Sequence, residues 1–299
     1  MPPALRSKRN VILLAVAVAA LVLMVAAAPA LAGTFTPQKG VSPNQDKIRT
    51  LFIITGTMGL LILIGVEAMI IYSIVKFRRR RGGPEPVAVH GNAPLEIGWT
   101  IGAIVLVAIV SVVTFLFLPG ILNPAQSGPG GLQLAAGVPY AAVGQEQAPG
   151  GKALRIHVNG QQYIWRYDYV SEKPLDGGRP VYAYTDMYVP VNTTVTLKIY
   201  SSDVIHSWWV PQLGGKADAT PGHTNETWFK IRKAGVYYGQ CAELCGDNHA
   251  DMRNRVIALP VDQYQNWIEN QRRNILAAQK ALAAARKAGI GNTEAKGNQ

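Results

Sequence analysis

The sequence predicts a membrane-anchored all-β protein, in which a two-helix transmembrane hairpin precedes an exported β-domain. Two long apolar runs lie between residues 51 and 118, and short segments of alternating polarity fill residues 152–262. Apolar runs of that length are typical of membrane spans, whereas closely spaced alternating segments are typical of strands. The two cysteines of the chain both lie in one short loop of this second region, which marks the place to look for chemistry.

Residues 1–32 have the features of a secretory signal peptide. Basic residues precede an apolar run from 11 to 28, which ends in a small-residue pattern at Ala30 and Ala32. A basic flank, an apolar core and an A-x-A end are the parts of a cleaved export signal. A retained membrane anchor is the alternative, because the run is nearly long enough to span a bilayer.

The two apolar runs predict a transmembrane hairpin. The first, 51–75, contains one charged residue, Glu67, and the second, 97–118, contains none. A bilayer core requires about 20 apolar residues in helical form, and both runs satisfy this requirement. The predicted segment extends over 45–120, with helices at about 50–77 and 96–118.

The loop between these helices sets the orientation. It begins with the sequence KFRRRR at residues 76–81. Because positive residues are retained on the cytoplasmic side, this loop is expected in the cytoplasm. Both mature termini and everything after residue 118 are then expected outside it, on a bacterial plasma membrane. Cysteines there lie in an oxidising or metal-handling compartment.

The formal net charge of +11 does not indicate a nucleic-acid partner. Residues 119–262 contain twelve basic and twelve acidic side chains, so the exported domain is close to neutral. The positive excess lies in the first 81 residues and after residue 262, where it reflects membrane topology and a basic tail. Membrane lipid is therefore an expected contact, and nucleic acid is not.

The remainder of the chain divides by composition. Residues 121–151 are rich in Gly, Pro, Ala and Gln, which is typical of a linker. Residues 152–262 contain strand-like segments that predict a β-sandwich or barrel; these are ALRIHVNG, QQYIWRYDY, VYAYTDMYV, TVTLKIY, NETWFKI and RNRVIAL. Residues 263–299 are expected to form a C-terminal helix and a disordered basic tail.

The loop GQCAELCGDNHADM, residues 239–252, concentrates unusual donors. Cys241, Cys245, His249 and Met252 offer thiolate, imidazole and thioether groups, a set that selects copper over harder cations. An upstream segment, DVIHSWWVP, supplies a second histidine, His206. Two neighbouring thiolates can each bridge two ions, so the ligand count suits a dinuclear copper centre. Met252 is then one weak ligand, and the backbone must supply the other.

Three other uses of the cysteines remain open from the residues alone: a disulfide, a zinc site, and free cysteines with a structural role. A disulfide between Cys241 and Cys245 fits an exported chain, but closing so short a loop stabilises little and leaves His249 and Met252 without a role. A structural zinc site of two Cys and two His is compatible with the ligand types, although its usual spacings differ.

The motifs resemble those of subunit II of haem-copper cytochrome c oxidases, the subunit that bears the CuA centre. The resemblance rests on SSDVIHSWWVPQLGGKADATPGHTNETW, AGVYYGQCAELCGDNHADM and LEIGWT, and it covers most of residues 45–265. It implies a cupredoxin-like Greek-key β-sandwich for residues 152–262. Nitrous oxide reductase has a similar loop but also a large propeller domain, for which this chain has no room.

The resemblance implies a role for each matching position. The copper-ligating side chains match His206, Cys241, Cys245, His249 and Met252. Glu243 matches the residue that gives copper its backbone carbonyl, and its side chain would face a magnesium ion shared with subunit I. Glu96 matches the carboxylate at the cytoplasmic entrance of a proton channel.

The implied function is electron transfer within an oxidase that couples oxygen reduction to proton translocation. An extracytoplasmic donor, cytochrome c or another protein, would supply single electrons to the copper pair, which passes them to haem in subunit I. Subunit III is a further expected partner. The oxygen chemistry belongs to subunit I. The alternative from another class is a membrane-anchored copper carrier or chaperone without a redox role.

One position departs from the family pattern. The family has W-x-W where this chain has Tyr163 and Trp165, and the first of those tryptophans is the expected point of electron arrival. An aromatic ring remains at Tyr163, so both residues are candidates for that role. The near-neutral domain also weakens the case for a strongly basic cytochrome, and it favours a membrane-anchored or weakly charged donor.

Overall fold

The two apolar runs form helices that are longer than the runs themselves. The computed structural model describes residues 36–78, 90–125, 127–128, 131 and 153–288. Helix α2 (Pro43–Lys76) starts with a proline at its first turn, a position that needs no backbone donor, and Asn92 caps helix α3 (Ala93–Leu122) through the amide of Leu95. Both are long and apolar enough to cross a membrane. The signal-peptide region, the arginine run after residue 78, most of the linker and the final tail lie outside the described residues.

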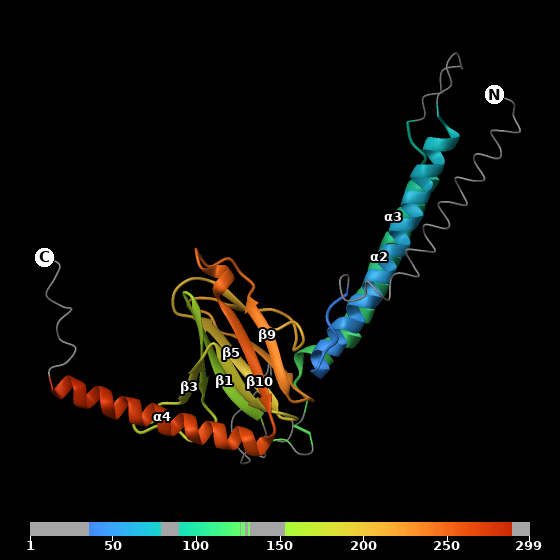
Figure 1. Cartoon of the computed structure of the whole chain (residues 1–299). Helices are drawn as coiled ribbons and strands as arrows, with labels where there is room; N and C mark the ends of the chain where they lie inside the picture. Colours follow the sequence, from blue (N-terminus) through green and yellow to red (C-terminus); the bar gives the residue numbers. More distant parts are fainter. Residues whose placement is uncertain (1–35, 79–89, 126, 129–130, 132–152, 289–299) are drawn as a thin grey trace, which may run out of the picture. The chain divides into compact units, whose positions relative to one another are not determined.

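The exported region is a sandwich of two five-stranded sheets (Figure 1). One sheet has the order β3-β2-β1-β5-β8 and the other has the order β4-β10-β9-β6-β7. β1 pairs with β5, and β4 with β10, in parallel; the remaining pairs are antiparallel. The strands are β1 (Ala153–Gln161), β2 (Ile164–Tyr169), β3 (Val181–Tyr184), β4 (Asp186–Pro190), β5 (Thr194–Ser201), β6 (His206–Trp209), β7 (Ala217–Ala219), β8 (Asn225–Lys230), β9 (Gly235–Cys241) and β10 (Arg253–Leu259). This arrangement confirms the predicted all-β sandwich.

The core lies between the two sheets, where side chains with strand periodicity meet. Leu154, Ile156 and Val158 of β1 are completely buried, as the alternation in the sequence predicts. On the next strand, Trp165 and Tyr167 are also fully buried, so aromatic side chains fill much of the interior. This core supports the strands from which the site residues project.

The segment VYAYTDMYV, which the sequence presented as one strand, forms two. Thr185 interrupts it with a φ of +62°, a left-handed conformation that a β-branched residue rarely adopts and that ends an extended strand. Its amide donates to the carbonyl of Trp165 in one sheet, whereas its carbonyl accepts from the amide of Arg255 in the other. Thr185 is therefore the corner at which the chain changes sheets.

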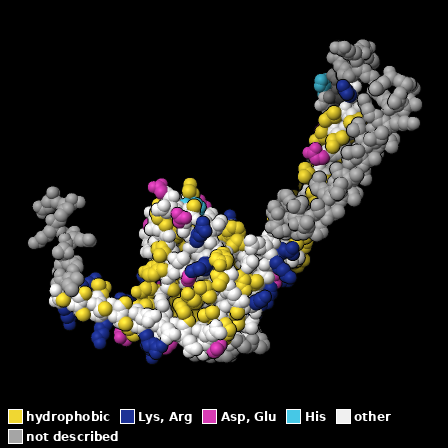
Figure 2. Space-filling view, viewed as in Figure 1, with side chains coloured by type: hydrophobic (Ala, Val, Ile, Leu, Met, Phe, Trp, Pro, Cys, Tyr) yellow, Lys and Arg dark blue, Asp and Glu magenta, His cyan; other side chains and the backbone are white. Residues whose placement is uncertain are grey.

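Helix α4 (Val261–Lys287) packs against the domain through its first half. Its Trp267 ring stacks on Tyr188 of β4 with ring centroids 4.3 Å apart, and its buried Tyr264 donates a hydrogen bond to Glu172. Beyond residue 276 the side chains are mostly exposed, and Lys and Arg side chains project along the helix (Figure 2). The aromatic contacts thus anchor the helix by one end.

Strand β8 is hydrogen-bonded to both transmembrane helices. The indole N–H of Trp228 donates to the carbonyl of Ile121 at 2.8 Å, and the side-chain Nδ2 of Asn44 donates to the carbonyl of Trp228 at 2.7 Å. Arg232 and Asp46 form an ion pair at 2.6 Å nearby. These bonds connect the ends of α2 and α3 to the sheet that begins with β3 and ends with β8.

Candidate metal centre

Two neighbouring strands bring the first pair of candidate ligands together. His206 begins β6 and Cys241 ends β9, and these strands pair with Trp208 opposite Cys241. The Nδ1 atom of His206 lies 3.9 Å from the Sγ atom of Cys241. Strand pairing therefore brings together His206 and Cys241, which are 35 residues apart along the chain.

The loop after β9 returns the remaining candidates to the same place. The Sγ of Cys245 lies 3.9 Å from that of Cys241, 3.5 Å from Nδ1 of His249 and 3.8 Å from Sδ of Met252. The amide of Cys241 donates to the carbonyl of Met252 at 2.9 Å, which closes the loop at its base. Gly246, at a φ of +130°, supplies a turn that L residues rarely adopt.

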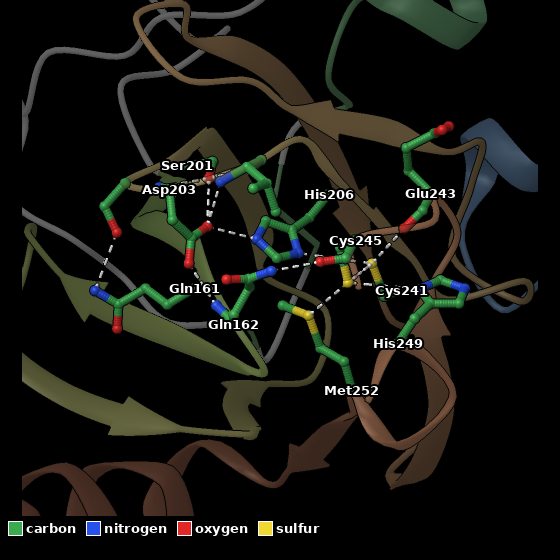
Figure 3. Close-up of polar contacts among 12 residues, drawn as sticks. Gln161, Gln162, Ser201, Asp203, His206, Cys241, Glu243, Cys245, His249 and Met252 are labelled. Carbon is green, nitrogen blue, oxygen red and sulfur yellow. Dashed lines mark hydrogen bonds and ion pairs between the residues drawn. The ribbon is translucent and has the colours of Figure 1, made fainter. Parts of the chain in front are cut away.

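Glu243 presents two different groups in two directions. Its backbone carbonyl accepts from the Sγ of Cys241 at 3.3 Å, so this oxygen lies beside the sulfurs. Its carboxylate is exposed and points away from them (Figure 3). The backbone oxygen is therefore available as a ligand on the inner side, while the carboxylate faces outward.

Burial sets the protonation state of Cys245. His206 is completely buried, and Cys241, Cys245 and Met252 are at most 4% exposed, whereas His249 is half-buried. Burial, together with the neighbouring Cys241 thiol, raises the pKa of Cys245 to about 11. Without metal this residue is therefore a thiol at neutral pH, and a metal that binds its thiolate must displace a proton.

Asp203 holds the other side of the His206 ring. Its Oδ1 lies 2.8 Å from Nε2 of His206, on the face opposite the sulfurs (Figure 3). Partial burial alone would raise the pKa of Asp203, but hydrogen bonds from His206 and from the amides of Gln162 and Val204 lower it. The residue is thus an ionised acceptor, and Nδ1 of His206 is left free to bind a metal.

The donor set fits copper. One ligand atom from each of His206, Cys241 and Cys245 lies within 4.8 Å of the others. The thioether of Met252, the imidazole of His249 and the carbonyl of Glu243 each lie within 4 Å of one of the two sulfurs. Thiolate, thioether and imidazole are the ligand types that copper prefers, and two sulfurs this close can be shared by two ions. The cysteines themselves are free thiols.

The other predicted residues lie at different distances from this cluster. Trp165 is fully buried and meets the His206 ring edge-on, with ring centroids 5.9 Å apart. Tyr163 is half-buried, and its hydroxyl accepts from the amide of Asp247 in the cysteine loop. Glu96 lies apart from the cluster in the first turn of α3, where its Oε1 accepts from the amide of Asn92 at 3.0 Å.

Three residues of the site were missed by the sequence reasoning. Asp203 contacts His206 and Gln162 contacts Cys245, while Gly160 of β1 lies against the His206 ring. Asp203 could have been suspected, because a carboxylate three residues before a candidate ligand can hold its ring. Gln162 and Gly160 offer no local signal, because their partners are 83 and 46 residues away along the chain.

Comparison with known proteins settles the family. Residues 30–116 match the model of the cytochrome c oxidase subunit II transmembrane domain, and residues 172–259 match that of its periplasmic domain. The chain belongs to the cytochrome c oxidase subunit II family. It is therefore subunit II of an oxidoreductase complex and has other oxidase subunits as partners. Its two helices and its cupredoxin-like domain are those of a membrane protein with an exported domain.

The relatives are distributed among distant organisms. Cytochrome c oxidase subunit 2 of Alkalihalophilus pseudofirmus is 36% identical over 242 residues, covering 81% of this chain and 63% of that protein. A probable subunit 2 of Rickettsia bellii is 30% identical, covering 83% and 88%. The crystal structure of the periplasmic domain of subunit II (CoxB) of Bradyrhizobium japonicum is 33% identical, covering 41% of this chain and 96% of that one, with a TM-score of 0.37. Family membership and the His/Cys/Cys group together indicate copper binding.

Proposed function

We propose that this subunit II accepts single electrons from an extracytoplasmic donor and passes them to haem in subunit I, through a dinuclear copper centre. The observation that supports this proposal is the convergence of four donor atoms on two cysteine sulfurs that lie 3.9 Å apart. The proposed ligands are His206, Cys241, Cys245, His249, Met252 and the carbonyl of Glu243. When bound, the copper pair supplies a one-electron redox couple outside the membrane.

The protein contributes a rigid and largely buried set of ligand positions. Sheet pairing fixes His206 and Cys241, and the hydrogen bond from Cys241 to Met252 fixes the two ends of the loop. Because buried side chains in a packed interior move little, ligand positions change little between redox states. A small change in geometry favours fast transfer of electrons.

Electrons are proposed to arrive at the turn between β1 and β2. Tyr163 is partly exposed and hydrogen-bonded to the cysteine loop, so it connects the surface with that loop. Trp165 lies deeper and touches His206, so it connects the core with a ligand. The donor is proposed to be cytochrome c or another weakly charged or membrane-anchored carrier, because residues 119–262 contain equal numbers of acidic and basic residues.

Two further roles are proposed from the family resemblance. The exposed carboxylate of Glu243 would bind a magnesium ion shared with subunit I, and its outward orientation is compatible with that role. Glu96 would form the cytoplasmic entrance of a proton channel into subunit I, and its exposure at the start of α3 leaves it accessible. Subunit III is the remaining proposed partner.

The placement proposed for the chain is a bacterial plasma membrane. The exported domain, 152–262, and both mature termini would lie outside the cytoplasm, after cleavage of the signal peptide at about residue 32. The linker 121–151 would then connect the hairpin, 45–120, to the domain, and the segment 263–299 would follow it.

The test is made on the purified oxidase. We expect two coppers for each copy of this chain in addition to those of subunit I, and an electron paramagnetic resonance pattern from one electron shared by two copper nuclei. Cys245→Ser should abolish that pattern and slow reduction by the donor while the haems remain. One copper, zinc or an intact disulfide at the site would refute the proposal. Rapid exchange of the copper with added chelator would favour the carrier function instead, although burial of four of the ligand side chains opposes release.

A further inference from the structure

Gln162 is an exposed residue with one hydrogen bond to the carboxylate that holds His206 and another to the backbone of Cys245. It lies in the turn between β1 and β2, and its backbone N–H donates to Oδ2 of Asp203 at 2.6 Å. Its side-chain Nε2 donates to the carbonyl of Cys245 at 2.7 Å. One residue therefore connects the loop before β6 with the loop after β9 (Figure 3).

Asp203 uses both of its oxygens in this arrangement. Oδ2 accepts from Gln162, and Oδ1 accepts from Nε2 of His206, from the amide of Val204 at 2.6 Å and from Oγ of Ser201 at 3.1 Å. An ionised carboxylate only accepts hydrogen bonds. The hydrogen of the His206 ring is therefore assigned to Nε2, and the lone pair of Nδ1 faces the Sγ of Cys241.

We propose that Gln162 is a positioning residue, which together with Asp203 holds the His206 and Cys245 ligands at the spacing and orientation that the metal requires. We name this pair the Gln162–Asp203 bracket. The inference rests on the proposed copper function, and it adds a residue that touches no metal itself. Such outer contacts fix the ring orientation of a ligating histidine and the position of a ligand loop.

The Gln162–Asp203 bracket contacts His206 and Cys245 but not His249. The ring of His249 has one contact among the described side chains, at 3.5 Å to Cys245, and this residue is only half-buried. His206 is fully buried, and its ring is held by a carboxylate on the side opposite Cys241. Loss of the bracket should therefore loosen the His206 and Cys245 side of the site.

The adjacent glutamine provides a matched control. Gln161 donates through the same side-chain group to Oγ of Ser202 at 3.1 Å, so it also connects the turn with the loop before β6. Its side-chain bond reaches neither Asp203 nor Cys245. If these side chains only anchored the turn, substitution of either glutamine should have the same effect. The proposed positioning role predicts an effect on the metal centre for Gln162 alone.

The experiment compares Gln162→Met with Gln161→Met in the intact oxidase. Methionine has nearly the shape of glutamine but donates no hydrogen bond, and the backbone bond to Asp203 is preserved. We expect the Gln162 variant to retain its haems, to lose copper to a chelator about 10- to 100-fold faster than the control, and to show changed hyperfine couplings. Because these readouts need no electron donor, they separate positioning from any effect on docking.

Asp203→Asn tests the second arm. Asparagine replaces one of the two carboxylate oxygens with an NH2 donor, so the bonds from His206 to Oδ1 and from Gln162 to Oδ2 cannot both be kept, and the same direction of change is expected. Copper retention and spectra equal to those of the Gln161 control in both variants would overturn the inference. A wild-type oxidase that lacks two coppers at this site would instead overturn the proposed function, so the two failures are distinguishable. If Asp203→Asn does not assemble, the Gln162 variant decides alone.

Discussion

Gly160→Ala should damage the metal centre without unfolding the domain. Gly160 lies on β1, and a Cβ atom at this position would lie 2.8 Å from Cδ2 and 3.1 Å from Cγ of His206. It would also lie 3.2 Å from the ring of Trp165. Carbon atoms in ordinary contact are 3.4–4 Å apart, so the histidine ring must shift by roughly 0.6 Å.

The size of the effect follows from that shift. Forcing one extra methyl group into a packed core typically costs about 1–3 kcal/mol, which a domain with this core can tolerate. Ligand constellations, however, require placement to within about 0.5 Å. The variant is therefore expected to remain folded and to bind copper more weakly, with an altered optical spectrum.

The assay is the copper content and spectrum of the purified oxidase, alongside circular dichroism of the detergent-solubilised chain. Gly215→Ala is the control, because the nearest atom to its added Cβ is 4.0 Å away. If the Gly160 variant retained wild-type copper content and spectrum, the packing of His206 against β1 would not position the ligand, and the reasoning would fail.

Three further changes test separate contacts. Burial raises the pKa of Glu172 more than its hydrogen bond from Tyr264 lowers it, so the ionised form is disfavoured in the folded state and stability falls as pH rises through the folded pKa. Glu172→Gln should therefore raise the melting temperature at pH 7, with the gain vanishing below pH about 4; an equal gain at both pH values would contradict this. Trp228→Phe removes the donor to the carbonyl of Ile121 and should lower the free energy of unfolding by about 1 kcal/mol in denaturant titration. An unchanged midpoint would show that this bond does not contribute to stability. Met252→Leu keeps the buried volume but removes the thioether, so the copper potential should rise in redox titration while stability changes by less than about 1.5 kcal/mol; an unchanged potential would exclude the thioether as a ligand.

Strand periodicity revealed only part of the sandwich. The core residues of β1 and β5 gave clear signals, because apolar side chains on one face alternate along the sequence with polar side chains on the other. β6 gave none, because three of its four residues are buried and no alternation exists. β9 is mostly exposed, so it lacks the apolar rhythm of a half-buried strand. Tertiary contacts, not local pattern, make these two strands.

The candidate ligands were visible in the sequence because their chemistry is rare. A chain with two cysteines that places both beside a histidine and a methionine signals a soft metal site without any knowledge of the fold. The groups that orient those ligands are ordinary residues, such as Asp203 and Gln162, and only the folded chain brings them into contact. The sequence therefore indicates which side chains supply donor atoms, but the residues that orient these donors can be identified only from the folded structure.

Strand β10 has the cysteine loop at one end and helix α4 at the other. The strand begins at Arg253, next to Met252, and ends at Leu259, two residues before α4. Its seven residues place the base of the helix about 20 Å from the cysteine loop. The last turns of α4 are mostly exposed beyond Gln279, whose side chain accepts a hydrogen bond from Arg179 at 3.0 Å. They are consequently a convenient place to attach a fluorophore, an affinity tag or a surface linker, from which the colour of the copper could be followed undisturbed.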